Sequence, residues 1–159
     1  MTAADTVSSR TMTAPDGKSV TIQRDGWGVP YITGDDREAA EYGLGFAAAQ
    51  DRLWLFDVLR RAGRGVASQF LGPSDTTYGL DLEFGPPAGY SEQELTDMIN
   101  RTVTKMGPLG AMFLADTQSF VAGMNAYIAY LQTPQGLTEL PPEYATRALA
   151  VPPNFPPQP

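Results

Sequence analysis

The 159 residues suffice for one domain with its own core, and 42% hydrophobic and 18% charged residues are globular proportions. The net charge of −7 argues against nucleic acid as a partner, because phosphate contacts need clustered Lys and Arg. Cysteine and histidine are absent, which excludes disulfides, Ser-His-Asp catalysis and zinc sites with histidine ligands. No apolar run approaches the roughly 18 residues of a membrane span, and the N-terminus has no signal-peptide pattern, so no membrane partner is expected.

The first third of the chain predicts a small strand pair. Residues 1–17 are small and polar, so we expect a flexible lead-in. Residues 18–24 alternate apolar and polar side chains, as a half-buried strand does. Asp25-Gly26 marks a turn, and residues 29–32 resume an extended path. Because Pro30 has no N–H to donate, that second strand should be an edge strand or should begin there.

A long helix should follow the strand pair. Asp35 can cap this helix, and Glu38 follows three residues later, as in a capping box. The helix is predicted to reach about Arg61 and to stop at Gly63. Residues 44–59 are apolar on most sides of the helix, which indicates burial within a larger assembly.

Glycines inside the predicted helices indicate close packing. Gly43 and Gly45 lie in the first helix, and Gly123 lies in the last one. Each costs about 1 kcal/mol relative to Ala in a helix interior. We expect the close approach of a neighbouring backbone to offset that cost.

The middle of the chain predicts a short helix, a loop and an amphipathic helix. Residues 66–71 should form a helical turn, and the Gly- and Pro-rich residues 72–90 should form a long loop. Ser91 and Glu94 make a capping box. The helix behind them carries apolar residues at helical spacing, namely Leu95, Met98, Ile99, Thr102, Val103 and Met106.

The last part of the chain predicts one more long helix and a proline-rich end. Gly107-Pro108 should end the amphipathic helix and open another over about residues 109–131. Residues 140–144 should form a rigid turn. Residues 152–159 contain five prolines and should be extended. The sequence therefore predicts a mostly α chain with a short N-terminal β-strand pair (α+β), whose domain covers residues 18–151.

Three pairs of acidic residues could serve acid–base chemistry or bind calcium. Two of the pairs open predicted helices, where acids are favoured by capping and by the helix dipole. The third pair lies in the predicted loop and has no Asp-rich calcium repeat. We therefore favour a structural role for all three pairs, which are Asp35/Asp36, Asp81/Glu83 and Glu92/Glu94.

Other polar residues also have a structural interpretation and a functional one. Asp51, Arg52 and Asp57 lie mid-helix among apolar residues, and internal ion pairs are favoured over substrate-facing charges. Thr2 could be a terminal nucleophile after removal of Met1, but no predicted strand would hold it in place. The basic residues that close the first helix should complement its dipole rather than bind an anion: Arg60, Arg61 and Arg64.

Aromatic and methionine side chains are expected in the core. Trp27 and Tyr31 flank a turn and could line a pocket, although core packing is the favoured interpretation. The same holds for the Met and aromatic residues of the two later helices. In the last helix these are Met112, Phe113, Phe120, Met124 and Tyr127, followed on the same side by Leu131.

Five segments, taken in order, resemble the start of the penicillin acylase family of N-terminal-nucleophile hydrolases. The second and fourth segments are the more specific, because generic helices rarely reproduce both. The resemblance covers about residues 18–155. The segments are Val20–Ile32, Tyr42–Leu53, Arg61–Gly72, Phe120–Ile128 and Leu140–Tyr144.

The resemblance implies an α-chain region from a precursor that cuts itself into α and β chains. In this family the nucleophile and oxyanion donors lie in the β chain, and the acyl-pocket helix and a calcium-ligating acid lie later in the α chain. No catalytic, cofactor-binding or metal-binding residue is therefore assigned to this chain, although calcium is possible in the full enzyme. Two departures are Tyr31, where His is common, and Phe155, where Trp is common.

The leading hypothesis is an N-terminal α-chain domain of an amidohydrolase that cleaves acyl amides through an acyl-enzyme. The implied substrates are a β-lactam side chain, an N-acyl homoserine lactone or a related amide, and the implied location is periplasmic or extracellular. In the full enzyme the helices would pack on an αββα core. The expected partners are the rest of the α chain and the β chain, or a second copy of the fragment, which should be inactive alone. The alternatives are a non-catalytic helical interaction module and a metal-binding module.

Overall fold

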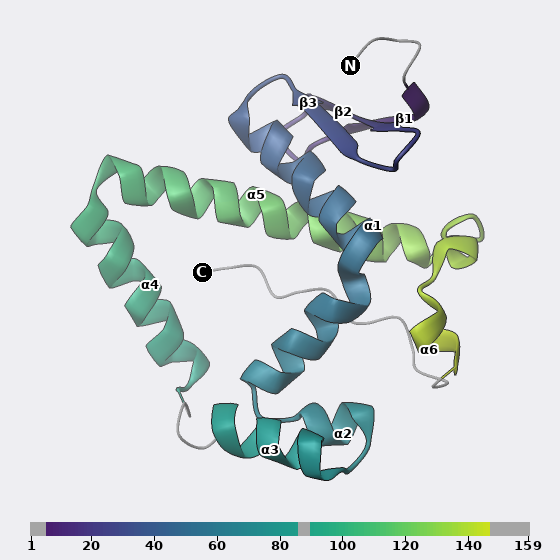
Figure 1. The fold of residues 1–159 in the computed structure, drawn as a ribbon. Helices are drawn as coiled ribbons and strands as arrows, with labels where there is room; N and C mark the ends of the chain where they lie inside the picture. The colour runs from purple at the N-terminus through teal and green to yellow at the C-terminus, as the bar shows by residue number, and fades with distance from the viewer. Residues whose placement is uncertain (1–5, 86–89, 147–159) are drawn as a thin grey trace.

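The computed structural model describes residues 6–85 and 90–146, and its N-terminal part is a three-stranded antiparallel sheet (Figure 1). The strands β1 (Thr6–Thr13), β2 (Ser19–Asp25) and β3 (Pro30–Gly34) lie in sequence order, with β2 in the centre. The predicted strand pair is confirmed as β2 and β3, where Ile22 is paired with Ile32. The prediction of a flexible lead-in is wrong for residues 6–13, because they pair with β2 as strand β1. The sequence of β1 is largely polar and shows no strong alternation of apolar residues, so it did not predict a strand.

The helix α1 (Arg37–Gly63) packs against the sheet through a glycine. A Cβ atom on Gly43 would lie 2.5 Å from Val20 Cγ2 and 2.8 Å from Ile32 Cγ2, so only a glycine lets the sheet approach this closely. The predicted cap is wrong by one residue. Asp36 accepts the hydrogen bond from Ala39 N at 2.9 Å, whereas Asp35 accepts one from Ser19 N of the sheet at 2.7 Å. Glu38 therefore lies in the first turn without completing a capping box.

The helix α5 (Pro108–Leu131) crosses α1 and forms the core with it (Figure 1). At the crossing, a Cβ on Gly45 would lie 1.9 Å from Phe120 O, and a Cβ on Gly123 would lie 1.9 Å from Tyr42 O. The close packing predicted for these glycines is confirmed. The core beside them consists of Ile22, Phe46, Ala47, Ala49, Leu53, Met124, Tyr127, Ile128, Leu131 and Tyr144.

Two short helices follow α1, and one of them corrects the predicted loop. The helix α2 (Ala67–Leu71) agrees with the predicted helical turn. Residues 72–90 do not form one long loop, because α3 (Asp75–Phe84) occupies their middle. The Ser74 hydroxyl accepts from Thr77 N at 3.2 Å, and Thr77 Oγ1 accepts from Ser74 N at 2.9 Å. This reciprocal cap supports a helix in a segment whose glycines and prolines predict a loop.

The remaining described elements are α4 (Glu92–Met106), the 3₁₀ helix η3 (Gly136–Glu139) and α6 (Pro142–Thr146). The capping box of Ser91 and Glu94 is confirmed, and Gly107 separates α4 from α5 as predicted. Of the rigid turn predicted for residues 140–144, Leu140 caps the end of η3 and residues 142–144 form the start of α6. The proline-rich tail, residues 152–159, lies outside the described residues. The chain is thus mostly α with short N-terminal strands, as predicted, but the sheet has three strands where the sequence predicted a pair.

Candidate functional site

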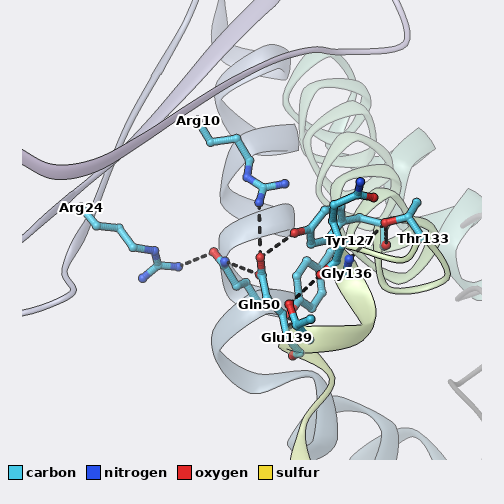
Figure 2. Close-up of polar contacts among 10 residues, drawn as sticks. Arg10, Arg24, Gln50, Tyr127, Thr133, Gly136 and Glu139 are labelled. Carbon is cyan, nitrogen blue, oxygen red and sulfur yellow. Dashed lines mark hydrogen bonds and ion pairs between the residues drawn. The ribbon is translucent and has the colours of Figure 1, made fainter.

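A polar cluster joins the sheet, α1 and η3, and Glu139 is its centre (Figure 2). Its carboxylate accepts hydrogen bonds from Tyr130 OH at 2.5 Å and Gln50 Nε2 at 3.1 Å. Arg10 Nη2 lies 3.6 Å from the same carboxylate, and the guanidinium stacks 4.4 Å from the Tyr130 ring centre. Tyr127 OH donates to the backbone oxygen of Glu139 at 3.3 Å. These contacts hold Glu139 between the sheet, α1 and α5.

Arg24 extends the cluster to the tip of the β2–β3 hairpin. Its Nη2 atom lies 2.9 Å from Asp51 Oδ1 and donates to Gln50 Oε1 at 3.0 Å. Its Nη1 atom donates to Gly28 O at 2.7 Å. The ion pair predicted for Asp51 is therefore present, but its predicted internal position is wrong, because Asp51 is exposed. Arg52 is exposed too and has non-helical backbone angles that mark a kink in α1.

Chemically, this cluster is a scaffold. Its one central acid is already surrounded by donors, and the chain has neither histidine nor cysteine to act as base or nucleophile. Burial, followed by the nearby charge of Glu139, raises the pKa of Tyr127 to about 12. The Tyr127 hydroxyl therefore stays protonated and does not serve as a base near neutral pH.

A second buried cluster surrounds Asp57, whose side chain is fully buried. Arg60 Nη2 lies 2.6 Å from Asp57 Oδ1, and Arg61 Nε lies 3.1 Å from the same atom. Tyr144 OH donates to Asp57 Oδ2 at 3.3 Å, and burial above all raises the pKa of Tyr144. The prediction of an internal ion pair is confirmed for Asp57. Arg60 and Arg61 lie in the last turn of α1, as the sequence predicted, and in addition they form ion pairs with Asp57.

Each of the three acidic pairs has at least one member with a structural partner, whereas Glu83 is exposed on α3. Besides the caps of Asp36 and Glu94, Glu92 lies 2.7 Å from Arg64 Nη2. Asp81 accepts from Ala67 N at 2.6 Å and from Ser68 N at 3.0 Å, which caps α2 from a residue 14 positions away. The Ser68 hydroxyl also donates to Asp81 and, as the leading cause, lowers its pKa. Spacing along the chain carried no signal for this long-range cap.

The described part of the chain has neither a cluster of acidic metal ligands nor a helix that could span a membrane. Among residues 6–85 and 90–146, no three of His, Cys, Asp and Glu lie close enough together to hold a metal ion. In the same ranges, no helix is long and apolar enough to cross a membrane. Thr2 and Phe155 lie outside the described residues.

Several aromatic and aliphatic side chains expected in the core are exposed instead. The favoured core placement is wrong for Trp27, which is 92% exposed at the hairpin tip, and for Tyr31, which is 43% exposed. On α1, Leu44, Leu55 and Leu59 are exposed as well. The apolar pattern of α1 thus continues beyond the surface that this chain can bury.

The packing prediction for the two later helices holds only in part. Met124, Tyr127 and Leu131 of α5 are buried, as expected. In contrast, Met112 and Phe113 of α5 are exposed, and α4 has no buried residue at all. An apolar groove of about 340 Å³ lies between the two helices. Its lining residues are Met98, Ile99, Thr102, Val103, Met106, Gly110, Phe113, Leu114 and Thr117.

Comparison with known proteins relates both the fold and the sequence to acylases. Residues 19–158 match the family model described as penicillin amidase. A solved structure of thermostable penicillin G acylase from Alcaligenes faecalis superposes with a TM-score of 0.66 at 26% identity. That likeness covers 87% of this chain and 66% of the solved chain.

Curated relatives give the same answer at the level of sequence. Penicillin acylase 2 proenzyme from Pseudomonas sp. (strain SE83) is 31% identical over 110 residues, which are 69% of this chain and 13% of the relative. Penicillin G acylase from Escherichia coli is 29% identical over 80% of this chain and 14% of the relative. Acyl-homoserine lactone acylase PvdQ from Pseudomonas syringae pv. tomato is 31% identical over 74% of this chain and 15% of the relative. The chain thus spans about one seventh of the length of these curated relatives, and it belongs to the penicillin amidase family.

Proposed function

We propose that this chain is the N-terminal α-chain domain of an amidohydrolase that cleaves the amide between an acyl group and an amine. The reaction would pass through an acyl-enzyme on a nucleophile supplied by the remainder of the enzyme. The candidate substrates are a β-lactam side chain, an N-acyl homoserine lactone and related acyl amides. The calcium ion and the periplasmic or extracellular location implied by the resemblance stay predictions for the full enzyme.

The observation that carries this proposal is the combination of a family match with an incompletely buried surface. The match covers residues 19–158, whereas the curated relatives are about seven times longer than the aligned part. Leu55 and Leu59 of α1 and Phe113 of α5 expose apolar area that a larger enzyme would cover. The polar clusters of Glu139 and Asp57 supply a rigid scaffold without a free base or nucleophile. This chain would therefore position a catalytic core and perform no chemistry itself.

The first test is catalytic. The purified chain is incubated with a chromogenic phenylacetyl amide and with a long-chain acyl amide, and Escherichia coli penicillin G acylase is the positive control. We expect no turnover above background from this chain alone. Turnover by the chain would contradict the proposed division of labour, because it would require a nucleophile within these residues.

The second test asks whether the chain can act as the corresponding part of an acylase. Its family-matched segment replaces the corresponding segment of Escherichia coli penicillin G acylase, and a deletion of that segment is the matched control. We expect the chimera to cut itself and to hydrolyse the phenylacetyl amide, and the deletion to do neither. A chimera that is expressed like its parent but is neither processed nor active would overturn the proposal.

The helical interaction module is the competing proposal, and surface exposure separates the two. A self-sufficient module should bind little of a dye that reports exposed apolar surface, and it should remain monomeric. The acylase domain should bind the dye or self-associate, because its apolar surface lacks its usual cover.

A further inference from the structure

The groove between α4 and α5 is formed by two helices that touch at their joint. Gly110, near the start of α5, lies against the α4 backbone, since a Cβ on Gly110 would lie 2.5 Å from Val103 O. Beyond that contact the two helices diverge, and Figure 1 shows α4 standing away from α1. The groove of about 340 Å³ therefore has helical walls on two sides and is open along α4.

The walls of the groove are apolar but unburied. Along α4, Met98 and Met106 are 42% and 43% exposed, and Phe113 on α5 is 63% exposed. An amphipathic helix normally buries its apolar stripe against a neighbour. Here α5 covers only one edge of the stripe, on the side of Val103. Methionine side chains adapt to irregular partners, so the remaining stripe is suited to receive another apolar surface.

The outer rim of the groove is positively charged. Met98 and Thr102 border both the groove and a neighbouring surface hollow that contains Arg101 and Lys105. Both basic residues are exposed, and neither forms an ion pair within residues 6–85 and 90–146. A basic rim is notable in a chain whose net charge is −7.

The acids of α4 form no ion pair with Arg101 or Lys105 within the described residues, although Asp97 lies one helical turn before Arg101. Glu92 pairs with Arg64 at 2.7 Å, and the Glu94 carboxylate accepts from Ser91 N at 2.8 Å. Asp97 accepts a hydrogen bond from Gln93 at 2.9 Å. The open rim of the groove therefore favours an occupant that brings negative charge.

We propose that the groove binds an amphipathic helix whose apolar face fills it and whose acidic residues meet Arg101 and Lys105. The inference rests on the proposed function, since the remainder of the acylase would supply this helix. A helix suits the groove because the ridges of side chains on a third helix can pack into the space between two diverging helices. The length of α4, 15 residues or about 22 Å, matches a partner helix of four turns.

The test uses this chain and two synthetic helical peptides of equal length with the same leucine face. One peptide carries glutamate beside the apolar face, and the other carries lysine. Fluorescence anisotropy of the labelled peptides measures their affinities. Non-specific attraction to a chain of net charge −7 would favour the lysine peptide. We expect the opposite, with the glutamate peptide binding about fivefold tighter through two exposed ion pairs.

Three variants locate the binding. Phe113→Asp should weaken the binding of both peptides by roughly tenfold or more, because a charge would be placed in the apolar contact. Leu82→Asp is the matched control, since Leu82 is 68% exposed on α3, outside the groove, and it should leave both affinities unchanged. The double variant R101E/K105E should reverse the preference between the peptides. Circular dichroism verifies that each variant is folded.

Other outcomes would overturn the proposal. Equal binding, or tighter binding of the lysine peptide, would exclude an acid-bearing occupant. An unchanged affinity in folded Phe113→Asp would place the binding elsewhere. If a dimer detected by ultracentrifugation is lost in Phe113→Asp while neither peptide binds, the groove belongs to a second copy of the chain. None of these results has a catalytic readout, so failure here is distinguishable from failure of the proposed amidohydrolase function.

Discussion

Gly45 of α1 and Gly123 of α5 bring the backbones of the two helices into direct contact where they cross. A Cβ at Gly45 would lie 1.9 Å from Phe120 O, and one at Gly123 would lie 1.9 Å from Tyr42 O. The obstructing atoms belong to the backbone, so a flexible side chain cannot move aside to make room. The helix crossing, and with it the placement of the sheet relative to α5, depends on these two glycines.

Replacing either glycine of the crossing should separate the helices. We expect Gly45→Ala to lower the free energy of unfolding by about 3 kcal/mol, the upper range for overpacking a core. Gly79→Ala on α3 is the control, because nothing lies within 4 Å of its added Cβ. That control should be neutral or should stabilise the protein by about 1 kcal/mol through helix propensity. Urea unfolding measures both, and equal effects would refute the close-contact explanation.

The buried carboxylate of Asp57 should contribute more to the stability of the protein than the hydroxyl of its partner Tyr144. Asp57→Asn leaves the guanidinium groups of Arg60 and Arg61 without their counter-charge, and we expect a loss of about 3 kcal/mol. Tyr144→Phe removes one hydrogen bond, at 3.3 Å, and should cost about 1 kcal/mol. Thermal unfolding compares the two variants. A smaller effect for Asp57→Asn than for Tyr144→Phe would show that the ion pairs contribute little.

The ion pair of Arg37 and Asp116 should make the stability of the protein depend on pH in the acidic range. Three hydrogen bonds of 2.7–2.9 Å join their side chains, and this contact lowers the pKa of Asp116 from its ordinary value of 3.8. Because the folded-state pKa is depressed, the pair stabilises the protein above the ordinary pKa. That stability is lost as the pH falls through the folded-state pKa.

Asp116→Asn should therefore flatten the acid limb of the stability curve. Urea unfolding between about pH 5 and about pH 2 should show a shallower loss of stability than in the wild type. Asp97→Asn, at an exposed position on α4, is the control and should leave the curve parallel to that of the wild type. Parallel curves for Asp116→Asn as well would argue against the linkage.

The buried Tyr127 should make the stability of the protein depend on pH in the alkaline range. Burial and Glu139 raise the pKa of Tyr127 from 10.0 to about 12, so the folded state favours the neutral hydroxyl. Its contribution is complete below the ordinary pKa and is lost as the pH rises from about 10 toward 12. Tyr127→Phe should reduce the loss of stability over this range, whereas the exposed control Tyr78→Phe should not. Denaturant unfolding at increasing pH measures the difference.

Elements whose signals are local were predictable from the sequence. The capping box of Ser91 and Glu94 lies within one turn, and Gly107 with Pro108 marks the junction of α4 and α5. The cap of α1 was misplaced by one residue, because Asp35 and Asp36 have the same capping chemistry. Only the position of Ser19 N in the sheet decides that Asp35 bonds to the sheet and leaves Asp36 to the helix.

Elements that depend on distant partners were not predictable. The strand β1 is formed by pairing with β2, and its own sequence shows little alternation. The cap of α2 comes from Asp81, 14 residues downstream of Ala67. Trp27 looks like a core residue by type, yet the rigid hairpin tip holds it in solvent.

The sequence by itself determined the family, the mostly helical class and the absence of histidine and cysteine chemistry, since these depend on residue identity and short-range order. Tertiary structure alone decided which apolar side chains find partners. Residues of one helical stripe, such as Met98 and Val103, are equivalent along the chain and become different only when α5 covers one edge of α4. The groove and its basic rim exist for that reason: burial depends on where neighbouring helices lie, and a local pattern does not encode this.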